Sequence, residues 1–111
     1  MPKFTLRVYG VALAMARGAG PTGGDIGRSD SDLARQFRRA LTSILLNIAE
    51  AMDADGRNRH ARFRIALGST NECIAILEVA DALGYITVDA ALMDQFQHVR
   101  ATLLRLVMPK R

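Results

Sequence analysis

The feature that most restricts the fold is an apolar repeat between residues 31 and 54. Apolar side chains recur there every three or four positions, which is the spacing of one face of an α-helix; they are Leu33, Phe37, Leu41, Ile44, Ile48 and Met52. Ser31 precedes the repeat and is the predicted N-cap. Leu45 and Leu46 extend the apolar surface onto a second face. The pattern predicts a long helix with more apolar surface than one stripe.

Three further helices are predicted around this one. Residues 4–17 are apolar nearly throughout, which fits a helix or a buried strand, and the length favours a helix. A helix over about 58–83 should end at Gly84, and Thr87 is the predicted N-cap of a last helix. The last helix carries a heptad repeat of Leu92, Phe96, Val99, Leu103 and Leu106. Because the connections are short, the last three helices should be antiparallel neighbours. The expected fold is all-α, an antiparallel up-and-down four-helix bundle forming one domain over residues 1–111.

The glycine-rich stretch 18–30 is predicted to be a linker between the first two helices. It holds five glycines and Pro21, which are typical of breaks between elements. Gly18, Gly20 and Gly23 have the spacing of a dinucleotide-binding loop. However, Pro21 lies inside that spacing, and the chain offers no strands for the parallel sheet that such a loop requires. The linker interpretation is therefore preferred.

The cysteine content and the hydropathy of the chain indicate the cellular compartment in which the protein is expected. Cys73 is the single cysteine, which excludes an internal disulfide and fits a reducing cytoplasm. No apolar run reaches the roughly 20 residues needed to span a bilayer. Lys3 and Arg7 precede an apolar stretch that loosely imitates a secretory signal, but cleavage there would remove a helix that the bundle needs. The expected location is cytoplasmic, with no membrane association.

The positive charge is concentrated in the middle of the chain. Residues 35–64 hold seven arginines and three acids, a balance of +4 that equals the net charge of the whole chain. Such a segment can attract phosphates, although the lack of interleaved aromatic residues disfavours base stacking. The candidate nucleic-acid-binding residues are Arg35, Arg38, Arg57, Arg59 and Arg62. Any such binding to RNA or DNA should be weak and sensitive to salt.

The polar residues within the second and third helices are interpreted as structural. If the hairpin turns near residue 56, facing positions have numbers that sum to about 112. Glu72 then faces Arg39, and Glu50 faces Arg62, as two ion pairs that set the register. The two glutamates are too far apart in this hairpin to act as a catalytic pair. His60 and His98 lack partners at ligand spacing, and Cys73 is interpreted as an inert core thiol. We therefore expect no catalytic residues, metal site or cofactor.

Three segments resemble a known bacterial family. "QFRRALTSILLNIAEA" (36–51), "RFRIALGSTNE" (62–72) and "LGYI" (83–86) are similar to the four-helix-bundle proteins first noticed in intervening sequences of large-subunit ribosomal RNA genes. The chain differs at Leu45, where the family often has proline, and at Ala51, where glycine is usual. These differences suggest a straighter and longer second helix.

The resemblance implies a homo-oligomer, because members of this family form pentameric rings of bundles. It implies no enzymatic activity. Some relatives are accessory proteins of diversity-generating retroelements, where they bind a reverse transcriptase and RNA. Two hypotheses follow: an oligomeric scaffold or interaction protein of unknown process, and, as the alternative, a nucleic-acid-binding accessory protein.

Overall fold

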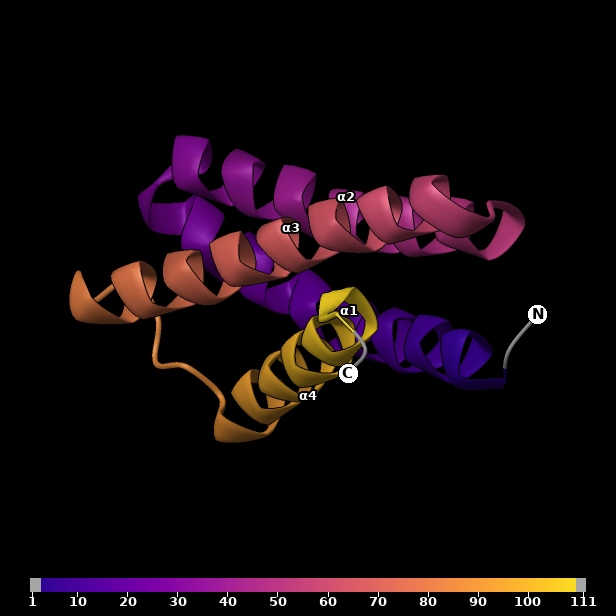
Figure 1. Cartoon of the computed structure of the whole chain (residues 1–111). Coiled ribbons are helices and arrows are strands. Elements are labelled where there is room, and N and C mark those ends of the chain that lie inside the picture. Colours follow the sequence, from indigo (N-terminus) through magenta and orange to yellow (C-terminus); the bar gives the residue numbers. More distant parts are fainter. Residues whose placement is uncertain (1–2, 110–111) are drawn as a thin grey trace.

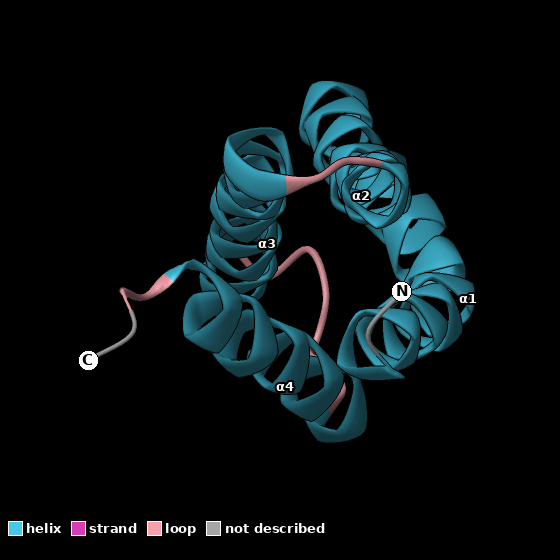
Figure 2. Cartoon of the chain, turned by 45° about the vertical axis from the view of Figure 1, so that its right-hand side comes forward, coloured by secondary structure: helices cyan, strands magenta, loops and turns pink. Residues whose placement is uncertain are grey.

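The protein is a four-helix bundle, seen in a computed structural model that describes the backbone of residues 3–109 and the side chains of residues 7–109. Its helices are α1 (Lys3–Ser29), α2 (Ser31–Asp53), α3 (Gly56–Ala82) and α4 (Ala90–Val107). The two ends of the predicted 1–111 domain lie outside the described residues. Each helix packs against the one before and the one after it, and α4 returns to α1 (Figures 1 and 2). The predicted all-α bundle is confirmed.

The core consists of the residues that the apolar repeats single out. Phe37, Ile44 and Ile48 of α2 are fully buried, whereas Leu33 and Met52 at its two ends are partly exposed. The heptad positions of α4 are buried from Leu92 to Leu103. The rings of Phe37 and Phe96 lie 6.2 Å apart at 50°, a tilted pair that joins α2 to α4 across the bundle. No helix within residues 3–109 is long and apolar enough to cross a membrane.

The predicted linker over 18–30 is wrong, because α1 continues through it to Ser29 with Pro21 inside the helix. The buried positions of α1 recur every three or four residues along its whole length; they are Val8, Ala12, Met15, Ala19, Gly23 and Ile26. At Gly23, a Cβ would lie 3.5 Å from Cδ2 of Phe37, and at Gly27 it would lie 3.4 Å from Cβ of Ala34. The glycines thus let α1 approach α2 closely, and the apolar burial offsets their low helix propensity.

Two predicted helix caps are shifted by a residue or two. The N-cap of α2 is Asp30, not Ser31, because the Asp30 carboxylate accepts a hydrogen bond from Leu33 N at 2.9 Å. The N-cap of α4 is Asp89, not Thr87, and it accepts from Ala91 N at 3.1 Å. A carboxylate at these positions also interacts favourably with the helix dipole, which a hydroxyl does not.

The end of α3 is as predicted. Gly84 has a φ of +79°, the left-handed conformation that glycine adopts without strain. Tyr85 N donates to Ala80 O at 2.9 Å and Gly84 N donates to Asp81 O at 3.0 Å. These two bonds form a Schellman motif that satisfies the last carbonyls of the helix.

Candidate functional site

The α2–α3 hairpin has the register expected from its short turn. Ser69 Oγ lies 2.8 Å from Ser43 Oγ, and Arg62 Nη1 lies 2.9 Å from Glu50 Oε2. Both pairs of residue numbers sum to 112. The Glu50–Arg62 ion pair therefore lies where the hairpin geometry places it, about half exposed on both sides.

A hydrogen-bonded chain of polar side chains continues from this ion pair along the hairpin. Arg62 Nη1 donates to Asn47 Oδ1 at 3.4 Å, and Asn47 Nδ2 donates to the backbone oxygen of Ser43 at 2.9 Å. Ser43 in turn is bonded to Ser69 on α3. The polar residues of segments 36–51 and 62–72 thus hold α2 and α3 together, which is the structural role expected for them.

The other expected ion pair, between Arg39 and Glu72, is not formed. The two side chains line one polar hollow with Ser43 and Ser69, yet no Arg39–Glu72 contact reaches ion-pair distance. Both residues are exposed, so water solvates each charge and an ion pair there would gain little free energy. The Ser43–Ser69 hydrogen bond holds the helices together at this level instead.

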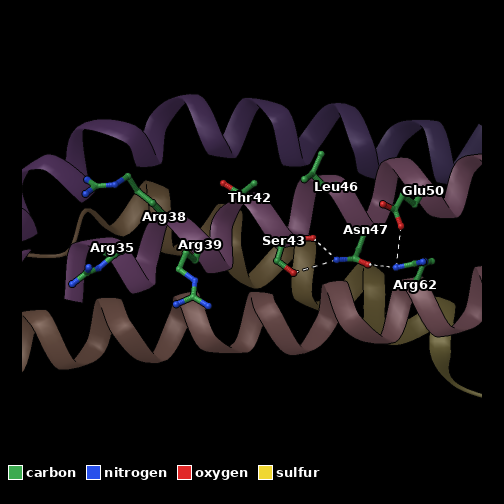
Figure 3. Close-up of a pocket in the computed structure, with 9 residues that line it drawn as sticks. All are labelled: Arg35, Arg38, Arg39, Thr42, Ser43, Leu46, Asn47, Glu50 and Arg62. Carbon is green, nitrogen blue, oxygen red and sulfur yellow. Dashed lines mark hydrogen bonds and ion pairs between the residues drawn. The ribbon is translucent and has the colours of Figure 1, made fainter. Parts of the chain in front are cut away.

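The main candidate site is an open hollow of about 540 Å³ along α2, which we call the basic hollow. Arginines lie at one end of it and the Glu50–Arg62 ion pair at the other, with Leu46 between them (Figure 3). Its lining residues are Arg35, Arg38, Arg39, Thr42, Ser43, Leu46, Asn47, Glu50 and Arg62. Four guanidinium groups line it; those of Arg35 and Arg62 form ion pairs with Asp32 and Glu50, so Arg38 and Arg39 give this surface its net positive charge.

The basic hollow contains three of the five predicted nucleic-acid-binding arginines. Arg57 and Arg59 lie outside it, in the first turn of α3 and, by helical rise, roughly 20 Å along the hairpin from Arg38. The guanidinium group of Arg59 is hydrogen-bonded to the backbone there: its Nη2 donates to Ala54 O at 2.6 Å and its Nε donates to Ala51 O at 3.2 Å. The five predicted arginines therefore do not all line one hollow: Arg35, Arg38 and Arg62 do, whereas Arg57 and Arg59 lie near the turn of the hairpin, and nucleic-acid binding by the five stays a prediction.

Arg39 is the member of the basic hollow that the sequence analysis assigned elsewhere. Arg38 and Arg39 lie three and four residues after Arg35, and these spacings place side chains on the same side of a helix. Arg35 Nη2 forms an exposed ion pair with Asp32 Oδ1 at 2.8 Å. Arg38 and Arg39 have no ion pair or side-chain hydrogen bond to any residue of the described chain. Their guanidinium groups are therefore available to an anion.

Apolar side chains are exposed beside the basic hollow. Leu46 of α2 is 57% exposed and Ile65 of α3 is 47% exposed. The hairpin register places them at the same level on adjoining helices, so we name them the Leu46–Ile65 patch. Ile65 also lines a second hollow with Ala61 and Arg62. Further along α3, Val79 and Leu83 are also exposed, and together these residues leave apolar surface along the outside of the hairpin.

Cys73 is enclosed in the core behind this surface. Its side chain is fully buried, with Sγ 4.0 Å from the backbone oxygen of Phe37. Burial, together with the negative charge of Glu72, raises the pKa of the thiol from 9.0 to about 12. A nucleophilic cysteine needs a lowered pKa and access to solvent, so Cys73 has the properties of a core residue.

The raised pKa of Cys73 predicts a loss of stability at alkaline pH. The unfolded thiol ionises near its ordinary pKa of 9.0, whereas the folded thiol stays protonated up to about 12. The free energy of unfolding should therefore fall as the pH rises above 9, by about 1 kcal/mol between pH 9 and 10 from this group. Urea titrations of the wild type and of Cys73→Ala check this: the variant should lose about 1 kcal/mol less over that interval. Parallel losses in both proteins would contradict it.

The two histidines do not form a site. His60 Nε2 lies 2.9 Å from the backbone oxygen of Val107, which ties the start of α3 to the end of α4. His98 lines a separate hollow between α1 and α4. Within the described residues, no group of three or more His, Cys, Asp or Glu side chains is close enough to hold a metal ion.

Comparisons with known proteins agree with this fold. The model of the 23S rRNA-intervening sequence protein family matches residues 27–105. A crystal structure of a protein of unknown function, from the S23 ribosomal protein family of Bacteroides thetaiotaomicron, superposes with a TM-score of 0.83. It is 23% identical over 94% of this chain and 97% of its own length, which supports a shared fold. No curated protein matches the chain.

Proposed function

The chain belongs to the 23S rRNA-intervening sequence protein family, and we propose that it is a non-enzymatic, homo-oligomeric scaffold. The subunits assemble through the outer face of the α2–α3 hairpin. The observation that carries this proposal is the Leu46–Ile65 patch, where two large apolar side chains at one level of the hairpin are about half exposed.

Burial of this patch against a second subunit is favoured by the free energy of removing apolar surface from water. Full burial of a large aliphatic side chain is worth about 1.5–3 kcal/mol, and about half of that is left to gain for each of these half-exposed residues. Exposed apolar side chains with polar groups around them are typical of association sites. Here the rim is supplied by Asn47 and the Glu50–Arg62 ion pair, which are already hydrogen-bonded within one subunit. Burial of the patch therefore leaves few unsatisfied polar groups.

The direct test is the mass of the wild-type protein in solution. Light scattering after size-exclusion chromatography should give several times the 12.1 kDa of one chain. The mass should persist at high salt, because apolar contacts are not screened. A mass of one chain at micromolar concentration would contradict the proposal.

A second candidate function is binding to the phosphates of nucleic acid through the basic hollow. The observation that favours it is the grouping of Arg35, Arg38 and Arg39 on one side of α2, with the last two unpaired. Phosphate binding of this kind depends on charge and not on base sequence. Because Leu46 also lines the hollow, this function requires that the end with Arg35, Arg38 and Arg39 stays open when the subunits assemble; assembly would then repeat that end and increase the total affinity.

Replacing Arg35, Arg38 and Arg39 by glutamine should abolish most of this binding. The variant should weaken binding to structured RNA at low salt, and the slope of log affinity against log salt should become shallower by about 2–3 for three lost phosphate contacts. Gel shifts over a salt series measure both quantities.

The matched control replaces Arg17, Arg28 and Arg64 by glutamine. It removes the same charge from positions outside the basic hollow. If the control loses affinity as much as the first variant does, binding depends on net charge alone, and the hollow is not the site. If the wild type does not bind RNA or DNA at low salt, this second function is excluded.

A further inference from the structure

The hollow that His98 lines is on the side of the bundle away from the hairpin, between the first half of α1 and the second half of α4. Its volume is about 460 Å³, within the range of small-molecule sites. The described residues that line it are Arg7, Val8, Gly10, Val11, His98, Thr102 and Arg105. We propose that this α1–α4 hollow binds a small amphiphilic anion, an apolar molecule that ends in a single carboxylate or phosphate group.

The walls of the hollow suit an apolar body. Val8 is almost fully buried at 2% exposed, and Val11 beside it is partly buried. The hydroxyl of Thr102 donates to His98 O at 3.0 Å within α4, so it requires no partner from a ligand. A Cβ added at Gly10 would meet no atom within 4 Å. The glycine therefore leaves open space in this part of the wall.

The charges at the hollow suit an anionic head. Arg7 and Arg105 both line it, and none of the described residues that line it is acidic. Within the described chain, the guanidinium of Arg7 and the imidazole of His98 make no hydrogen bond or ion pair. Arginine binds carboxylate and phosphate through a fork of parallel hydrogen bonds.

The combination of walls and charges excludes other ligand classes. A metal ion would require acidic, thiolate or clustered imidazole ligands, and the hollow offers one histidine. A nucleic acid strand would require a longer basic track with stacking aromatic residues. An apolar tail with one negative head satisfies both the walls and Arg7.

The test uses the wild-type protein with three probes of equal chain length, the two anions below their micelle concentrations and the alcohol below its solubility limit. Decanoate and decyl phosphate carry the two anionic heads, and decanol carries none. In ¹H–¹⁵N NMR titrations, both anions should shift the amides of Gly10, Val11 and Thr102 in a saturable way. Decanol should bind at least ten times more weakly, because it lacks the contact with Arg7. If one anion alone binds, the head group is identified.

Two matched glycine variants separate this site from general apolar binding. Gly10 and Gly20 both lie in α1, are exposed, and have no atom within 4 Å of an added Cβ. Leucine at either position raises helix propensity equally. Gly10→Leu should fill the hollow and weaken anion binding at least ten-fold, whereas Gly20→Leu should leave it unchanged.

Arg7→Gln provides the test of the head group. It should weaken binding of both anions about ten-fold and leave the weak binding of decanol unaltered. Three results would overturn the proposal: no saturable binding of either anion, equal binding of decanol, or shifts centred on the Leu46–Ile65 patch. Equal effects of Gly10→Leu and Gly20→Leu would also overturn it.

Discussion

Replacing Leu46 and Ile65 together by glutamine should weaken self-association of the protein about 10–10²-fold. Full burial of a large aliphatic side chain is worth about 1.5–3 kcal/mol, and because each of these two is already about half buried in the subunit, together they account for about 1.5–3 kcal/mol per interface; each 1.4 kcal/mol is a factor of ten. Light scattering over a dilution series measures the change. Glutamine is chosen because it preserves helix propensity and adds no charge to the arginine-rich surface.

The folded subunit should survive this double substitution. Both side chains are already about half exposed in the single chain, so the free energy of unfolding of the subunit itself should change by at most about 0.5 kcal/mol per site. The matched control is Met108→Gln, since Met108 is 56% exposed at the end of α4, outside the Leu46–Ile65 patch. If the control dissociates the oligomer and the double variant does not, assembly uses another face.

The double variant also separates the two candidate functions. It leaves Arg35, Arg38 and Arg39 in place, so each subunit keeps its capacity to attract phosphates. If binding to RNA depends on several repeated hollows, loss of assembly should lower the affinity through loss of multivalency. If one hollow is sufficient, the affinity per subunit should remain the same. The response of RNA binding to dissociation thus measures how far the second function depends on the first.

The parts of the fold with strong local signals could be predicted from the sequence. The repeats in α2 and α4 define one apolar face each, and a helix with that pattern has few other ways to be buried. Gly84 marks the end of α3 because the left-handed conformation favours glycine. The short turn after Asp53 fixes which residues of α2 and α3 face each other, so the contact between Glu50 and Arg62 follows from counting.

The candidate site was less predictable because closeness in sequence differs from closeness in space. Arg57 and Arg59 are neighbours of Arg62 in the chain but lie at the turn of the hairpin. Arg59 is bonded to the carbonyls that end α2, a role that depends on where the helix stops. The α1–α4 hollow was missed because its residues come from opposite ends of the chain, and periodicity carries no information about such a pairing.

The error over residues 18–30 has a different cause. Glycine and proline are strong local signals for a break, but their effect is opposed by tertiary packing that only the bundle supplies. The helical spacing is present in the sequence, yet its later members, Ala19 and Gly23, are too small to register as an apolar face. The missing side chain of Gly23 is what lets α1 lie against Phe37.

Pro21→Ala should therefore raise the free energy of unfolding by about 2–3 kcal/mol. Inside a helix, proline lacks the N–H that would donate to the carbonyl four residues earlier, and its ring crowds that carbonyl; alanine removes both costs. Pro21 is exposed, so the substitution loses no core packing. Urea denaturation at a fixed protein concentration measures the change.

In a flexible linker the same substitution would leave the free energy of unfolding unchanged or lower it by up to about 1 kcal/mol, because proline restricts the unfolded chain. Pro109→Ala is the control, since Pro109 follows the end of α4. If Pro21→Ala raises the free energy of unfolding and Pro109→Ala does not, α1 is one continuous helix in solution. If Pro21→Ala lowers the free energy of unfolding, residues 18–30 form a linker.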